Sequence, residues 1–251
     1  MTAPSALLVG RPVPWASPVL VLATMGAAVA TLLSYGTPGS QVASYGAYWV
    51  LGMVLPGTLV SKALLGTRGS WLVDLTLGAL TGLMLELFAW AAFVGLDAGA
   101  WLRLWPLASL LVFAFRRARG RVLQRPRAPW PFWPSVTVAG AIILDCYHVG
   151  RTFFASYDLP PSGRGYYVDL PWHMGLAWEA TRGFPLATPQ AVGEGLLKYS
   201  WFVHAHLGAA SLVTAIDVPT IVLRLWPLPV LALVVLSTAV LGHQVSGRPW
   251  V

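Results

Sequence analysis

Long apolar stretches, several of them close to twenty residues and separated by short polar turns, limit this chain to very few architectures. About 20 consecutive apolar residues form a helix long enough to cross the hydrocarbon core of a bilayer. Hydrophobic residues make up 57% of the chain and charged residues only 10%, whereas soluble domains carry about 25% charged residues. So few charges could not cover the surface of a soluble protein of 251 residues. The sequence therefore predicts an all-α fold, a polytopic bundle of transmembrane helices.

About six transmembrane spans can be placed along the chain, and a seventh is the open alternative. Many of the 13 Trp residues lie at the ends of apolar stretches, where indole rings favour the membrane–water interface. The six predicted spans cover residues 15–35, 43–65, 71–94, 101–115, 132–148 and 219–241. A seventh would begin within residues 199–215. Asp217, Pro219 and Arg224 argue against it, because they would place a break and charges at membrane depth.

The basic residues predict the orientation of the bundle, because Lys and Arg are enriched in cytoplasmic segments of membrane proteins. Four separate segments carry them: Arg11, Lys62 with Arg68, the six-arginine run from Arg116 to Arg127, and Arg248. All four fall on one side if the N-terminus is cytoplasmic. The sequence thus predicts a multi-pass protein of the plasma membrane, and the net charge of +7 needs no nucleic-acid partner to explain it.

Residues 150–218 form the long polar segment that this orientation places outside the cytoplasm. They separate the last two predicted spans and belong to a C-terminal region, 131–251, which follows a four-helix N-terminal region, 1–130. Two short helices are expected inside the segment, one from Asp169 to about Gly183 and one over residues 199–215. Neither is long enough to span comfortably, so both are expected to lie along the membrane surface or to dip into it.

Asp169 is the candidate catalytic residue of this outer segment. One reading makes it a helix N-cap, since Asp is a preferred cap and Pro171 suits the first helical turn. That role does not exclude a second one as a general base. His173 lies four residues later, so both side chains share one helical face. His173 could orient Asp169 or bind a phosphate, and an interfacial histidine without a role is the equal alternative.

The remaining candidates could bind substrate. The outer cations that could hold a phosphate or pyrophosphate are Arg151, Arg164, Arg182 and Lys198. Their simpler interpretation is contact with the lipid surface or with water. Glu179, together with Asp158 and Glu194, could supply oxygen ligands to a hard divalent cation, although nothing in the spacing requires one.

His204 and His206 are separated by one residue, which turns them to different faces of a helix. They lack the i, i+4 spacing of a helical zinc pair, and zinc needs three or four ligands. No metal site is therefore predicted from these two residues.

Three acids fall within predicted spans, namely Asp74, Glu86 and Asp145. Ionisable groups inside a membrane are costly and mark functional positions. Asp74 and Asp145 lie near span ends, whereas Glu86 lies deeper. We expect Glu86 to be protonated or paired with a residue of another helix.

The order of segments in the second half of the chain resembles the first outer loop of the C-type superfamily of membrane glycosyltransferases. It is most similar to actinobacterial members that use polyprenyl-phosphate sugars to build the cell envelope. The resemblance covers residues 132–251. The segments that carry it are Asp169-Leu-Pro-Trp-His173, Gly183-Phe-Pro185, Tyr199–Phe202, Ala205-His206-Leu207, Ile216-Asp217 and Leu223-Arg224-Leu225.

The resemblance implies an inverting sugar transfer with Asp169 as the base, His173 beside it, and His206 near the start of the second loop helix. It implies a polyprenyl-phosphate sugar as donor, a glycan or lipid as acceptor, and membrane lipid around the bundle. Family members continue with further helices, so the chain would be the N-terminal part of such an enzyme. The competing hypothesis is a non-catalytic scaffold or accessory subunit whose outer loop binds a membrane protein partner or a lipid.

Overall fold

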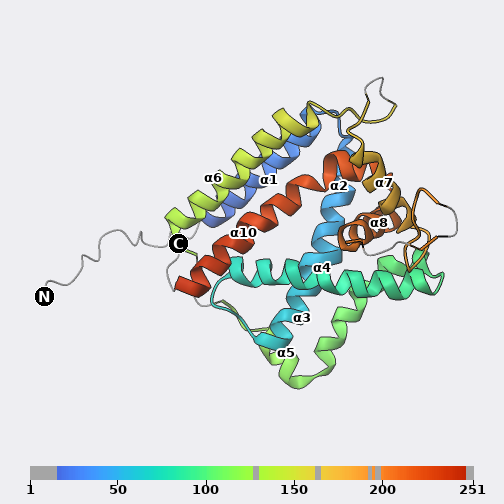
Figure 1. Cartoon of the computed structure of the whole chain (residues 1–251). Coiled ribbons are helices and arrows are strands. Elements are labelled where there is room, and N and C mark those ends of the chain that lie inside the picture. The colour runs from blue at the N-terminus through green and yellow to red at the C-terminus, as the bar shows by residue number, and fades with distance from the viewer. Residues whose placement is uncertain (1–15, 127–129, 162–164, 192–193, 196–198, 247–251) are drawn as a thin grey trace, which may run out of the picture.

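The computed structural model describes residues 16–126, 130–161, 165–191, 194–195 and 199–246 (Figure 1). These residues form helices and connecting turns, and their only β-type pairing is an isolated bridge between Ala187 and Gly195. The predicted all-α class is therefore confirmed.

The N-terminal half of the chain contains one unbroken helical rod, residues 39–65, and several separate helices. Its elements are α1 (Ala16–Ser34), then α2 (Gly39–Ala47), the π-helical η1 (Tyr48–Val54) and α3 (Leu55–Leu65) within the rod, α4 (Trp71–Gly95), the 3₁₀ helix η2 (Gly99–Ala114), and α5 (Arg116–Val122).

The C-terminal half contributes two long helical segments and two short helices between them. Its elements are α6 (Phe132–Val149) with the π-helical η3 (Gly150–Phe154), α7 (Asp169–Glu179), α8 (Phe202–Thr214), α9 (Val218–Thr220), the π-helical η4 (Ile221–Leu225), and α10 (Pro227–Ser246). In Figure 1, α1, α6 and α10 run along one another, while α7 and α8 lie together on the other side of the molecule.

Among the described residues, four helices are long and apolar enough to cross a membrane. They cover residues 39–65, 71–95, 132–154 and 227–246, which correspond to the second, third, fifth and sixth predicted spans. The apolar parts of α1, η2 and α8 are shorter. The structure thus supports a membrane protein with four candidate spans, and a count of six or seven remains a prediction.

Many large apolar side chains are exposed on the helices, in addition to the buried apolar core. Leu22, Phe88 and Leu144 are more than 60% exposed, although each lies within a helix. Conversely, Lys62 and Asp74 are buried. An apolar exterior of this extent is compatible with lipid as the surrounding medium and not with water.

Of the two placements expected for α8, the structure disagrees with the one along a surface, because neighbouring helices cover α8. Seven consecutive residues, His204 to Ala210, are buried within the protein. Gly208 packs so closely on α7 that a Cβ atom there would lie 2.6 Å from the Cβ atom of Ala180. Small residues let α8 enter the space between α4 and α7, and the carbonyl of Ala180 accepts a 2.7 Å hydrogen bond from Trp90 Nε1 on α4.

The break between α8 and α10 agrees with the expectation drawn from Asp217 and Pro219. Helix α8 ends where Ala215 adopts a left-handed conformation, with φ of 57°. Asp217 then caps α9 by accepting a 3.0 Å hydrogen bond from the Thr220 amide, and Pro219 lies in the first turn of that helix, where its missing N–H costs nothing.

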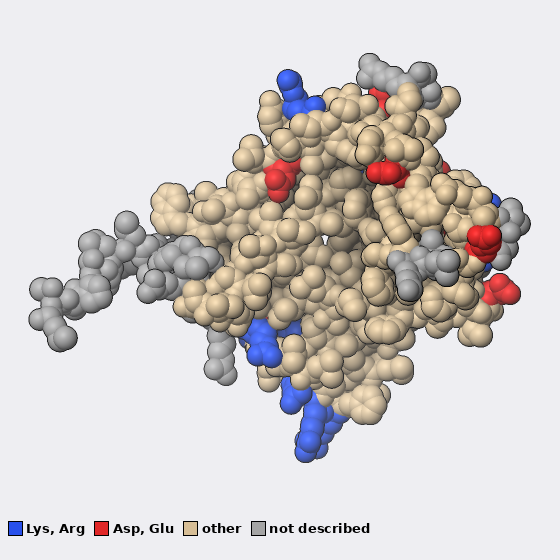
Figure 2. Space-filling view, in the orientation of Figure 1, with Lys and Arg blue, Asp and Glu red and all other residues tan. Residues whose placement is uncertain are grey.

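Charge is distributed unevenly over the molecule. Figure 2 shows the largest patches of Lys and Arg at the bottom of the view, over the region of α5, and the Asp and Glu patches in its upper and right-hand parts. The α5 end is therefore basic, as the arginine run predicted.

Candidate functional site

Asp169 is the first residue of α7 and its side chain is exposed. The prediction that Asp169 caps this helix is wrong, because the cap position belongs to Val168 and no side chain caps the helix. Val168 already has helical angles, φ of −51° and ψ of −34°, so the Asp169 side chain starts inside the first turn. A carboxylate in that turn still interacts favourably with the helix dipole.

His173 links α7 to α8 through a pair of histidines. Its Nδ1 atom lies 2.9 Å from Nε2 of His204, and the two rings are stacked at an interplanar angle of 10°. No hydrogen bond between His173 and Asp169 occurs among the described residues, so the expected orienting contact with Asp169 is replaced by one with α8. The roles of Asp169 and His173 in chemistry remain predictions.

The imidazole of His204 is held in its neutral form. Its side chain is 1% exposed, and this burial, followed by the proximity of His173, lowers the pKa of His204 from 6.5 to about 4. Two imidazole nitrogens form a hydrogen bond only if one carries a proton and the other does not. The histidine pair is therefore a fixed link near neutral pH and loses its acceptor when both rings are protonated.

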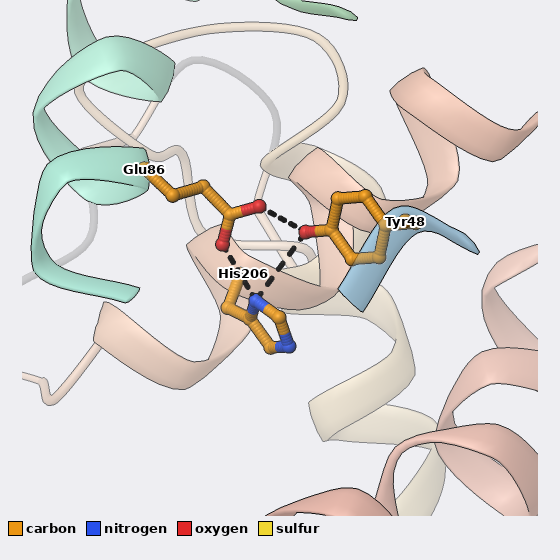
Figure 3. Close-up of polar contacts among 3 residues, drawn as sticks. All are labelled: Tyr48, Glu86 and His206. Carbon is orange, nitrogen blue, oxygen red and sulfur yellow. Dashed lines mark hydrogen bonds and ion pairs between the residues drawn. The ribbon is translucent and has the colours of Figure 1, made fainter. Parts of the chain in front are cut away.

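His206 lies two residues after His204 and faces another side of α8. It belongs to a buried polar cluster (Figure 3). Its Nδ1 atom lies 2.7 Å from Oε2 of Glu86 on α4. The hydroxyl of Tyr48, on η1, donates to Oε1 of the same carboxylate and lies 3.4 Å from His206 Nδ1. The prediction that Glu86 pairs with another helix is confirmed, and the cluster ties three helical elements together.

The same cluster contains polar atoms that have no hydrogen-bond partner among the described residues. These are Nε2 of His206, the hydroxyl of Tyr45 and Nε1 of Trp49, all of them buried. The Trp49 ring meets the His206 ring edge-on, with centroids 5.7 Å apart. When Nδ1 of His206 donates to the Glu86 carboxylate, Nε2 is left as an acceptor.

The predicted outer cations do not converge in the described part of the chain. Arg151 lies exposed on η3. Arg182 is 3.0 Å from the carboxylate of Glu179, one of the three acids considered as cation ligands. Arg164 and Lys198 lie outside the described residues. Within the described ranges, no group of three or more His, Cys, Asp or Glu side chains could hold a metal ion.

The sequence indicated most members of this site but not their contacts. It singled out His206 and Glu86 separately and gave no reason to choose Tyr48, one of 8 tyrosines. The signal that could have led to the cluster is the deep glutamate, since a carboxylate inside a membrane protein needs donors from neighbouring helices.

Fold and site together define a helical membrane protein with a buried carboxylate–imidazole–phenol cluster on α4, α8 and η1. The short helix α7, which packs against α8, starts at an exposed aspartate. Comparison of the chain with protein-family models, with curated proteins and with solved structures finds no match.

Proposed function

We propose that this protein is a membrane glycosyltransferase, or the N-terminal part of one, that transfers a sugar from a polyprenyl-phosphate donor to an acceptor outside the cytoplasm. The observation that carries the proposal is the exposed Asp169 carboxylate in the first turn of α7. One turn after Asp169, the stacked rings of His173 and His204 join α7 to α8. This contact fixes the helix that carries the carboxylate.

The reaction follows from the chemistry of an exposed carboxylate beside a lipid phase. Asp169 takes the proton of the acceptor hydroxyl as the hydroxyl oxygen bonds to the anomeric carbon of the sugar. The bond between that carbon and the phosphate oxygen breaks, and the configuration inverts. The polyprenyl phosphate leaves with the bonding electrons, and Arg151 is the described cation available to bind it.

The orientation of the bundle belongs to the same proposal. Helix α5 carries four arginines within seven residues, and basic residues favour the cytoplasmic side. With α5 in the cytoplasm and the N-terminus on the same side, α7 would face outward, where polyprenyl-phosphate sugars are consumed by this class of enzyme.

The decisive experiment replaces Asp169 by Asn in the full chain. Membranes containing the protein would be supplied with radiolabelled polyprenyl-phosphate sugars, hexoses and pentoses, together with cell-envelope acceptors. Loss of a general base lowers rates by about 10²–10⁴-fold. We therefore expect Asp169→Asn to reduce sugar transfer by at least about 100-fold while the protein level stays the same.

Asp97→Asn is the matched control, because it makes the same chemical change at an exposed turn residue with φ of 55°, a conformation that Asn adopts readily. Full activity in Asp169→Asn would refute the mechanism. Absence of transfer by the unaltered protein with every donor would instead favour the scaffold hypothesis.

A further inference from the structure

An open cavity of about 540 Å³ lies against α5, at the basic end of the molecule. Its volume falls within the roughly 300–1,000 Å³ typical of small-molecule sites. The residues that line it are Arg116, Arg117, Gly120, Arg121 and Gln124. Three guanidinium groups and an amide thus surround one space, and no acidic side chain lines it.

The cavity has a firm base, because the end of α5 is attached to the end of α3. Arg121 Nη1 donates to the carbonyls of Leu64, at 2.7 Å, and Ala63, at 3.3 Å. These carbonyls belong to the last turn of α3, which has no helical partners for them. Lys62 Nζ donates to the Gln124 carbonyl at 2.8 Å. Arg121 is therefore occupied in holding α5 in place.

The side chains of Arg116 and Arg117 do not form contacts of this kind. Both are exposed, and neither forms a hydrogen bond or ion pair with another described residue. Each offers a planar set of donors that matches a phosphate bidentately. The two free guanidinium groups are the anion-binding part of the cavity.

Apolar side chains flank these arginines. Phe115, immediately before α5, is 66% exposed, and Leu123, immediately after it, is 67% exposed. A short basic helix with exposed apolar residues at both ends is suited to the boundary between headgroups and acyl chains. The charged part of a ligand would then lie in the cavity and its apolar part beside Phe115 and Leu123.

We propose that this cavity binds the phosphate headgroup of an anionic phospholipid, with Arg116 and Arg117 contacting the phosphate and the acyl chains lying against Phe115 and Leu123. Basic pockets at the ends of membrane helices bind anionic headgroups in this way. The site is independent of the proposed sugar transfer, because it lies on α5 and not on α7.

The experiment measures lipid retention by the full-length protein in detergent, with native mass spectrometry. The probes are phosphatidylglycerol and phosphatidylcholine with identical acyl chains. The Arg116→Gln/Arg117→Gln double variant removes two charges from the cavity. The Arg119→Gln/Arg125→Gln variant removes two charges from the same exposed region without altering a lining residue. Size-exclusion profiles establish that each variant is folded.

We expect the unaltered protein to prefer phosphatidylglycerol. The cavity double variant should lose at least about 30-fold in its affinity, because each of its two arginines would contact the phosphate directly through charge-assisted hydrogen bonds. The control double variant should lose much less. Equal losses in the two double variants, or no preference for phosphatidylglycerol, would overturn the proposal. Displacement of the lipid by millimolar inorganic phosphate would also overturn it, because the site would then recognise a free anion and not a lipid.

Discussion

Glu86 is a completely buried acidic side chain, and its Oε2 atom lies 2.7 Å from His206 Nδ1. One of its oxygens accepts from the hydroxyl of Tyr48, and the other lies within hydrogen-bond distance of Nδ1 of His206, which donates when it carries the ring proton. A carboxylate accepts at both oxygens, whereas an amide of the same size accepts at only one. The site therefore requires a carboxyl group and not merely a polar residue of that size.

Glu86→Gln should destabilise the protein by about 1–3 kcal/mol. The amide NH₂ of the new glutamine would then face one of the two groups that donate to Glu86, the Tyr48 hydroxyl or His206 Nδ1. The apparent melting temperature in detergent measures this loss. Glu194→Gln is the control, since Glu194 is exposed and such substitutions usually change stability by less than about 0.5 kcal/mol. Equal melting temperatures for Glu86→Gln and the unaltered protein would show that the cluster does not stabilise the fold.

His204 should make stability depend on pH in the acidic range. Its folded-state pKa of about 4 lies below the unfolded value of 6.5, so the unfolded chain binds a proton more readily. The stabilisation from neutral His204 is complete above pH 6.5 and is lost as the pH falls toward 4. Melting temperatures measured from pH 7.5 to 4.5 should decline more steeply for the unaltered protein than for His204→Gln. Parallel declines would contradict this assignment.

At the scale of residues, chemistry could be predicted from the sequence but pairing could not. The cost of a deep glutamate indicated that Glu86 has a partner. The identity of that partner depends on how α4 and α8 approach, and 120 residues separate Glu86 from His206. Likewise, the cap assigned to Asp169 failed because helical angles already begin at Val168, a local detail that the preference of Asp for caps does not determine.

At the scale of elements, α4 packs very closely against the rod formed by η1 and α3, and glycines permit it. A Cβ atom at Gly82 would collide with the backbone carbonyl of Met53, and one at Gly78 would collide with Thr58. Gly78 and Gly82 are four residues apart on α4, the spacing that lets membrane helices approach closely. Buried Glu86 lies one turn further along the same helix, so this contact also helps to place it.

Gly82→Ala should therefore lower stability by about 1–3 kcal/mol, the usual result of overpacking a tight contact. Gly140→Ala on α6 is the matched control, because no atom lies within 4 Å of a Cβ placed there. This control should be neutral or up to about 1 kcal/mol stabilising, since Ala favours helix over Gly. Melting temperatures of both variants in detergent test the pair. Similar effects at the two positions would mean that α4 and η1 are not in close contact.

The existence of most helices could be predicted from apolar length, but the environment of a short helix could not. The length of residues 199–215 predicts a helix that lies along the membrane surface or dips into it, because it is too short to span. A short apolar helix can equally be buried by its neighbours, as α8 is. Its small residues Ala205, Gly208 and Ala209, which are all buried, were the available sign of close packing.

At the scale of the whole molecule, the basic end at α5 and the α7 end are predicted to lie on opposite sides of the membrane. The only cysteine, Cys146, is buried, so a Cys146→Ala background allows single cysteines to report exposure. Ser156→Cys follows η3, and Arg119→Cys lies on α5; both positions are exposed. In intact cells, a membrane-impermeant maleimide should label Ser156→Cys and should reach Arg119→Cys only after permeabilisation, because arginine-rich segments stay in the cytoplasm. The opposite labelling pattern would place α7 inside the cell, where Asp169 could not serve an acceptor on the outer face.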